Sequence, residues 1–240
     1  MTTQNLPGTD AARHGTGDAD LTIMLAAHDA FRRDLTRLVR AAAAADLSDP
    51  ARRRSVAAGW ELFKHELHLH HTAEDEVIWP VLRPRLAHSE HALSVLDAME
   101  EEHERIDPLL AAVDAAFEPR REDALADVID ALVTTLTGHL AHEEREGLPL
   151  IGVALTAAEW RGTGFKIARR NGLSEGGTMF AWILDGAPAA RGDAAPAAPG
   201  DPGARTAHVD PAVTLRTLPP PLRLLYRAVW KPRYNKTPRW

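Results

Sequence analysis

The sequence contains no cysteine, and this absence removes several kinds of site from consideration. Disulfide bonds, thiolate metal ligands, iron–sulfur clusters and cysteine nucleophiles are all excluded. Long apolar runs are missing too: the N-terminus lacks the hydrophobic segment of a signal peptide, and no later stretch approaches the roughly 20 apolar residues of a membrane span. We therefore expect a soluble protein, and a cytoplasmic location fits its composition.

Aromatic residues are scarce, at 5% of the 240 residues, whereas alanine and leucine are abundant. Because alanine and leucine are strong helix formers, the composition favours an all-α protein. With 45% hydrophobic and 26% charged residues, the chain can bury one good core. We expect a single domain with appendages.

Charge is distributed unevenly along the chain. The net charge is −6, but residues 211–240 contain seven cations and no acid, so the residues before them carry −13. These cations are Arg216, Arg223, Arg227, Lys231, Arg233, Lys236 and Arg239. An acidic body therefore carries a basic tail, which also contains Trp230, Tyr234 and Trp240.

Four stretches between residues 21 and 152 place apolar residues at the spacing of an amphipathic helix. Asp49 and Pro50 precede the second stretch as a helix N-cap and a first-turn proline. We expect Pro80 and Pro84 to end this helix and Pro149 to end the fourth. Four helices of roughly 20 to 30 residues with short connections predict an up-down-up-down four-helix bundle.

The composition divides the chain into five parts. Residues 1–20 are polar and expected to be disordered, residues 21–152 form the bundle, and residues 153–186 form a short helical extension. Residues 187–215 are a linker rich in proline, alanine and glycine, and residues 216–240 are the basic aromatic tail.

The most informative feature is a pair of His-x-x-x-Glu motifs near the ends of the second and fourth predicted helices. His70 is followed by Glu74 at four residues and His139 by Glu143, and a proline follows each histidine at ten residues. Residues four apart share one helix face, so each imidazole points the same way as its carboxylate. The repeat indicates two related helical hairpins.

Two further histidines, His28 and His103, fall in the apolar stripes of the first and third predicted helices. A buried imidazole or carboxylate without a partner is costly, so a core that holds six of them needs a shared partner. Metal ions supply one, because each hairpin then gives two histidines and one glutamate. The predicted ligands are His28, His70, Glu74, His103, His139 and Glu143.

Four imidazoles and two carboxylates suit a metal of intermediate hardness, and a carboxylate can bridge two ions about 3.5 to 4 Å apart. If both carboxylates bridge, each ion has four protein ligands, which leaves an octahedral ion two open positions. Zinc is more often satisfied with four ligands. Iron is therefore favoured over zinc, and manganese stays an alternative.

Neighbouring residues offer two rival motifs. His71 pairs with Asp75, and His142 pairs with Glu146, at the same four-residue spacing. The offsets to the prolines and the positions of the apolar stripes favour the first pair of motifs over these rivals.

Acidic residues beside the predicted ligands are assigned to solvated helix faces. They include Glu100, Glu101 and Glu102. For Asp29, which is next to His28, a role in supporting that histidine stays open.

Residues 21–152 resemble the hemerythrin-like (HHE cation-binding) family. The resemblance rests on the two His-x-x-x-Glu motifs, their flanking sequences EDEVIWP and EEREGLP, and the lone His28 and His103. It implies two non-haem iron ions with an oxo or hydroxo bridge, held by the six predicted ligands. Oxygen-carrying members have another histidine one turn after the third-helix ligand, where this chain has Asp107. That departure argues against simple reversible oxygen carriage.

Three kinds of function fit such a centre. An oxidoreductase would remove peroxide or nitric oxide in oxidative or nitrosative stress defence. A sensor would report oxygen or redox state through the tail, and a carrier would bind or store oxygen or iron. We rank the enzyme first, with peroxide, nitric oxide or oxygen as its small-molecule ligand, and we assign no catalytic residue beyond the ligands.

The basic tail is similar to an extension on some actinobacterial members of the family, and it has three interpretations. It docks on the acidic bundle with Trp230, Tyr234 and Trp240 as apolar anchors, or it contacts a partner or an anionic membrane surface. Nucleic acid ranks last, because the tail matches no recognised fold and the −13 body would repel phosphates. The oligomeric state is open between monomer and dimer.

Overall fold

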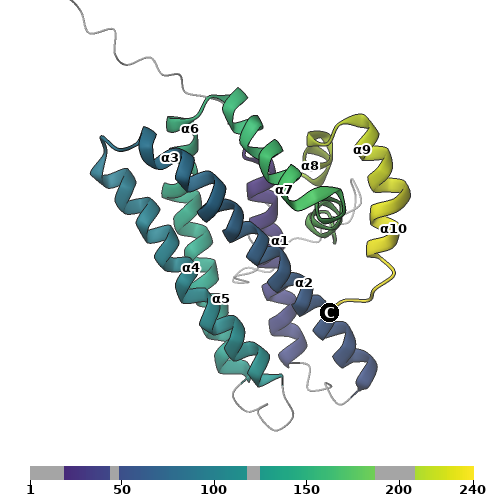
Figure 1. Cartoon of the computed structure of the whole chain (residues 1–240). Helices are drawn as coiled ribbons and strands as arrows, with labels where there is room; N and C mark the ends of the chain where they lie inside the picture. The colour runs from purple at the N-terminus through teal and green to yellow at the C-terminus, as the bar shows by residue number, and fades with distance from the viewer. Residues whose placement is uncertain (1–18, 44–48, 118–124, 187–208) are drawn as a thin grey trace, which may run out of the picture.

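The computed structural model describes residues 19–43, 49–117, 125–186 and 209–240. Within these ranges all regular secondary structure is helical, as the composition predicts (Figure 1). The expected disorder of residues 1–18 and the expected linker over residues 187–208 lie outside the described residues. Every helix in the described ranges is too short or too polar to span a lipid bilayer.

Four helical arms form a bundle, with α4 packed along α5 and α1 packed along both α5 and α2 (Figure 1). The predicted four-helix bundle is therefore confirmed. The first arm is α1 (Thr22–Ala43), and the third is α4 (Glu90–Ala116). The second arm joins α2 (Pro50–Ala73), the π-helical η1 (Glu74–Ile78) and α3 (Trp79–Arg85). The fourth joins α5 (Leu125–His142), the π-helical η3 (Glu143–Gly147) and α6 (Leu148–Ala154).

Side-chain caps begin the arms where the sequence predicts them. The Asp49 carboxylate accepts a hydrogen bond from the N–H of Ala51 at 3.0 Å, and Pro50 follows as the first residue of α2. The hydroxyl of Ser89 accepts from the N–H of Ala92 at 3.2 Å and begins α4 in the same way.

Pro80 and Pro149 do not end their helices, and this part of the prediction is wrong, whereas the second arm does end beside Pro84, at Arg85. In η1 the N–H of Trp79 donates to the carbonyl of Glu74, five residues earlier, so the hydrogen-bond register shifts by one residue. Pro80 then falls in the first turn of α3, where a missing N–H costs little. Because η3 and Pro149 repeat this arrangement, both arms continue through α3 and α6.

The bundle core consists of two apolar clusters. The larger cluster includes Phe31, Phe63, Leu67, Ile106, Leu136 and Leu140, and the smaller includes Ile78, Leu82, Leu96, Met99, Leu148 and Ile151. Each of α2–η1, α4 and α5–η3–α6 contributes to both. On α4, for example, Met99 belongs to the smaller cluster and Ile106 to the larger, with buried His103 between them. A layer of buried polar side chains therefore separates the two clusters.

The extension expected over residues 153–186 contains α7 (Ala157–Ile183). It begins with a capping box, in which Thr156 and Glu159 bind each other's backbone N–H groups. Gly172, with φ +85°, interrupts its helical backbone, a conformation that glycine adopts without steric cost. α7 therefore changes direction and lies against α1 and the tail (Figure 1).

The tail is helical for much of its length and begins earlier than expected. It comprises α8 (Pro211–Thr217), α9 (Pro220–Leu225), the π-helical η4 (Tyr226–Trp230) and α10 (Lys231–Tyr234). α8 starts inside the stretch expected to be linker, because Asp210 caps it and Pro211 is its first residue. The same Asp-Pro signal begins α2, so this boundary was readable in the sequence.

Aromatic side chains of the tail pack onto the body. Trp240 covers Gly59 of α2, and Trp230 covers Gly177 of α7; a Cβ atom at either glycine would lie 2.5 Å from the indole. Tyr226 and Tyr234 join the larger apolar cluster. These contacts support the interpretation in which the tail docks on the bundle, through aromatic rings rather than through its charges.

Candidate metal centre

All six predicted ligands lie together in the polar layer, in two adjacent groups. The first group consists of His28, His70, Glu74 and Glu143, whose ligand atoms lie within 4.8 Å of one another. The second group meets the same criterion and consists of His71, His103 and His139. The arrangement brings together five imidazoles and two carboxylates from all four arms.

His71 is the residue that sequence reasoning missed. It is buried, its ring stacks on that of His103 with centroids 3.9 Å apart, and its Nε2 has no hydrogen-bond partner. The interpretation of His71 as only a rival to His70 is therefore wrong, because both face the site. The adjacent histidines at positions 70 and 71 are visible in the sequence. The four-residue spacing could not show whether only one of them or both face the site.

The imidazole Nε2 atoms converge in pairs. Nε2 of His28 lies 3.2 Å from Nε2 of His70, and the same distance separates the Nε2 atoms of His103 and His139. Two ligands held about 2.1 Å from one ion at right angles stand about 3 Å apart. Each histidine pair is therefore spaced as two ligands of one metal ion.

The two carboxylates are buried without hydrogen bonds. Glu74 and Glu143 are both 0% exposed, and none of their four side-chain oxygens has a hydrogen-bond partner. Imidazole nitrogens do lie near these oxygens, for example His28 Nε2 at 3.1 Å from Glu143 Oε2, but without hydrogen-bond geometry. Carboxylate oxygens and imidazole nitrogens thus point their lone pairs into the same space without hydrogen bonds between them. A cation in that space would be a suitable partner for all of them.

Glu74 connects the two groups. Its Oε1 lies 3.2 Å from Nε2 of His70 in the first group, and its Oε2 lies 3.4 Å from Nε2 of His103 in the second. One carboxylate therefore faces both histidine pairs, as a bridge between two metal ions requires.

Carboxylates outside the cluster hold the far sides of three imidazoles. Nδ1 of His28 lies 2.9 Å from Glu144, Nδ1 of His103 lies 2.9 Å from Asp75, and Nδ1 of His139 lies 2.9 Å from Glu102. A carboxylate can only accept, so the proton sits on Nδ1 and the lone pair of the neutral ring is on Nε2. This is the tautomer and support typical of metal-binding histidines.

The comparison with known families agrees with this geometry. The hemerythrin HHE cation-binding domain matches residues 19–151, which is more than half of the 240 residues. The chain belongs to the hemerythrin HHE cation-binding family. No curated protein and no solved structure matches it.

In this hemerythrin domain the two buried carboxyl groups have pKa values shifted in opposite directions, so Glu143 is ionised more readily than Glu74. Burial raises the pKa of Glu74 well above its usual range, and the nearby Glu143 raises it further. Burial also opposes the charge of Glu143, but the positive charge of His28 outweighs it and lowers the Glu143 pKa to about 2. Cations between the two would stabilise both as carboxylates.

Imidazole protonation follows the same logic. Burial opposes the charge of His28, but Glu143 and Glu144 outweigh it and raise the His28 pKa to about 9, so a metal ion at Nε2 would displace a proton from this ring. Burial, followed by the charge of His28, lowers the pKa of His70 to about 3. Burial also lowers the pKa of His71 well below its usual value. His70 and His71 are therefore neutral near pH 7, the state in which an imidazole binds a metal.

The acids beside the ligands have different roles from those expected. Glu102 is not on a solvated face, because its two oxygens accept from His139 and His142 at 2.9 Å each. Asp29 accepts a hydrogen bond from the backbone N–H of Val209 in the tail at 3.2 Å, while Nδ1 of His28 is held by Glu144.

His142, the second rival, lies outside both ligand groups, as expected. Its Nδ1 contacts Glu102, and its Nε2 lies 3.8 Å from Glu146.

Asp107 does not face the site. It is exposed on α4, whereas the additional imidazole of the hemerythrin site comes from His71 on α2. The two ligand groups together therefore contain five imidazoles, although the third arm supplies only His103.

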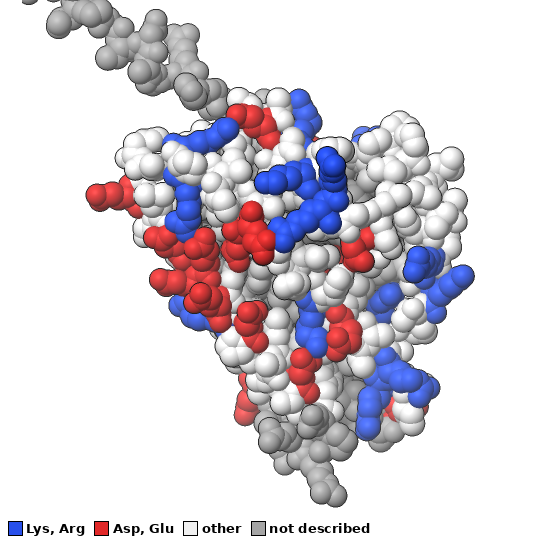
Figure 2. All heavy atoms as spheres, viewed as in Figure 1, with Lys and Arg blue, Asp and Glu red and all other residues white. Residues whose placement is uncertain are grey.

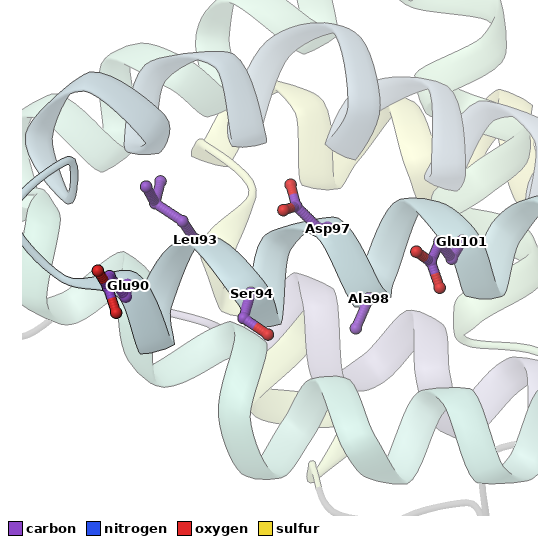
Figure 3. A pocket seen from close by; sticks show the side chains of 6 residues that line it. All are labelled: Glu90, Leu93, Ser94, Asp97, Ala98 and Glu101. Carbon is purple, nitrogen blue, oxygen red and sulfur yellow. The ribbon is translucent and has the colours of Figure 1, made fainter.

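A shallow hollow on the outer side of α4 is separate from this centre. Figure 3 shows its lining along α4, and none of the lining side chains belongs to either ligand group. They are Glu90, Leu93, Ser94, Asp97, Ala98 and Glu101.

Proposed function

We propose that this hemerythrin domain holds two iron ions and reacts with hydrogen peroxide, nitric oxide or oxygen, in defence against oxidative or nitrosative stress. The observation that carries the proposal is the pair of adjacent ligand groups joined by Glu74. Five nitrogen donors and two carboxylates form a donor set suited to iron. A pair of iron ions supplies open coordination positions and exchangeable electrons.

The ligand set divides unequally between the two ions. His71, His103 and His139 would hold one ion, and His28 and His70 would hold the other. The two carboxylates, Glu74 and Glu143, would be shared. The ion held by His28 and His70 would have one imidazole fewer than the other ion. We therefore infer that a small ligand binds to the ion on the side of His28 and His70.

The rest of the chain fixes and shields this set. Glu144 accepts from His28 and also from Arg32, at 2.7 Å, so the imidazole that flanks the more open ion is held from outside. The apolar clusters on either side exclude water from the layer. Only small ligands are therefore expected to react.

Stopped-flow spectroscopy of the iron-loaded protein with peroxide, nitric oxide and oxygen in turn tests the proposal. We expect two irons per chain and catalytic disproportionation of hydrogen peroxide to water and oxygen, or catalytic reduction of nitric oxide to nitrous oxide when an electron donor is added. The variant His28→Ala should lower turnover strongly, whereas His68→Ala, an exposed position on α2, should not. Reversible oxygen uptake without turnover would instead support a carrier or a sensor.

A sensor is the second candidate, because contacts connect the site with the tail. The ring of His70 lies 5.3 Å from that of Phe31, which lies 4.8 Å from that of Trp182 on α7. Asp29, next to His28, holds Val209 of the tail. If the protein is a sensor, ligand binding should change the rate at which a protease cleaves the tail; an unchanged rate would exclude this mode of signalling.

A further inference from the structure

The tail directs its aromatic residues inward and its cations outward. Tyr226 and Tyr234 are buried in the larger apolar cluster, and Trp230 packs on α7. Arg223 and Arg239 donate to backbone carbonyls of the tail itself. The other five cations are exposed: Arg216, Arg227, Lys231, Arg233 and Lys236.

None of these five cations forms an ion pair with an acid in the described ranges, although the body carries a large excess of acids. Figure 2 shows the acidic side chains concentrated toward the α4 side of the molecule, while basic side chains mark the edge formed by the tail. The tail's charge is therefore not used to hold the tail on the body. It is available to something anionic outside the chain.

Apolar side chains are interleaved with these cations on the same helical run. Leu224 is 69% exposed and Val229 is 47% exposed. Leu224, Arg227 and Lys231 follow one another at three and four residues, which places them on neighbouring turns of one face. Exposed apolar side chains beside unpaired cations are the combination by which an amphipathic helix lies in a membrane interface.

We propose that the outward face of α9, η4 and α10 docks on an anionic lipid surface. The headgroups would bind the exposed cations, and Leu224 and Val229 would enter the boundary between headgroups and acyl chains. This mode needs apolar and basic residues on one exposed helix face, which is the composition found here. It is independent of the chemistry at the metal centre.

A bilayer fits this face better than nucleic acid does. Single-stranded nucleic acid binds to exposed aromatic rings on which bases stack, whereas Tyr226, Trp230 and Tyr234 are turned toward the body. Phosphates alone would leave Leu224 exposed. The inward anchoring also fixes the helix with its basic face outward, so binding requires no rearrangement of the tail.

Vesicle flotation of the metal-loaded full-length protein tests this proposal. We expect binding to vesicles that contain phosphatidylglycerol, little binding to phosphatidylcholine alone, and release at high salt. Each cation near an anionic surface strengthens binding about fivefold, so Arg227→Gln combined with Lys231→Gln should weaken it about 30-fold. Leu224→Ser should weaken it about tenfold through lost apolar contact.

The matched control is Arg52→Gln combined with Arg54→Gln, which removes two exposed cations from the first turns of α2. This variant should bind as the parent does, and all variants should melt at the parent's temperature because the changed side chains point outward. No binding to anionic vesicles would overturn the proposal. Equal binding to neutral vesicles, equal loss in the control variant, or binding of single-stranded RNA without vesicle binding would overturn it as well.

Discussion

The imidazole of His71 stacks on that of His103, with the ring centroids 3.9 Å apart and the planes 10° apart. Its neighbour His70 turns instead toward His28 on α1, where the two rings meet edge to face at 5.1 Å. Consecutive residues of a helix point about 100° apart, so α2 can face two partner helices at one level. One helix thereby supplies an imidazole to each ligand group.

Removing the His71 side chain should therefore affect one metal position. We expect His71→Ala to lower the iron content from two toward one per chain, because the second group keeps only two imidazoles. His68→Ala, exposed on the same helix, is the matched control and should keep both irons. Metal analysis of the purified variants decides, and full occupancy in His71→Ala would show that His71 is not a ligand.

Glu102 should set metal affinity without touching the metal. Its two oxygens accept from His139 and His142, so Glu102→Gln leaves one of these imidazoles without an acceptor. Loss of such support costs roughly 10- to 100-fold in metal affinity. Chelator competition measures this loss, and Glu101→Gln, on the exposed side of α4, should show none. Equal affinities of the two variants would contradict the support role.

Glu66 should make stability depend on pH. This α2 residue is 3% exposed, its Oε1 has no hydrogen-bond partner, and burial, followed by the charge of Glu175, raises its pKa to about 8. The folded protein therefore keeps a proton that the unfolded chain releases near pH 4.5. Stability from this group is complete below pH 4.5 and is lost as the pH rises toward 8.

The neutral variant Glu66→Gln should remove that dependence. Its melting temperature should exceed the parent's by an amount that grows between pH 5 and pH 8, with a stability gain of the order of 3 kcal/mol at neutral pH. Glu104→Gln, at an exposed position, should follow the parent at every pH. A constant difference between Glu66→Gln and the parent would show that Glu66 is not the titrating group.

Gly177 should be essential for tail docking. A Cβ atom there would lie 2.5 Å from the indole of Trp230, so Gly177→Ala should displace the tail, lower the melting temperature and speed proteolysis of α9 and α10. Gly138 on α5 has no neighbouring atom within 4 Å of such a Cβ atom. Gly138→Ala should therefore stabilise the protein by about 0.5 to 1 kcal/mol, through helix propensity alone. Similar proteolysis of both variants would contradict the packing described.

The sequence predicted the bundle and the six residues because both depend on local spacing. Apolar stripes fixed the helices, and the His-x-x-x-Glu repeat placed four polar groups on inward faces. The spacing of residues along one helix does not show which other helix lies opposite a given residue. The roles of His71 and Glu102 could not be predicted for this reason, since each depends on a side chain from another arm.

The tail shows the same limit in another form. Its aromatic residues were expected to anchor it on the bundle, and Trp230, Tyr234 and Trp240 do pack on the body, but the sequence did not indicate that two of these rings cover Gly59 and Gly177. A glycine inside a helix gives no signal of the ring that covers it. The Asp210-Pro211 start of α8, by contrast, is a local signal and was present in the sequence.

The π-helical segment η1 sets the rotation of α3 about the axis of the second arm relative to α2. One extra residue in a turn rotates everything beyond it by about 100° relative to an uninterrupted α-helix. Deleting a residue from η1 would leave His70 and Glu74 in place while turning Trp79 and Leu82 out of the smaller apolar cluster. Because η1 also contains Glu74, which faces both histidine pairs, and Asp75, which accepts from His103, one turn sets both the geometry of the centre and the packing beyond it.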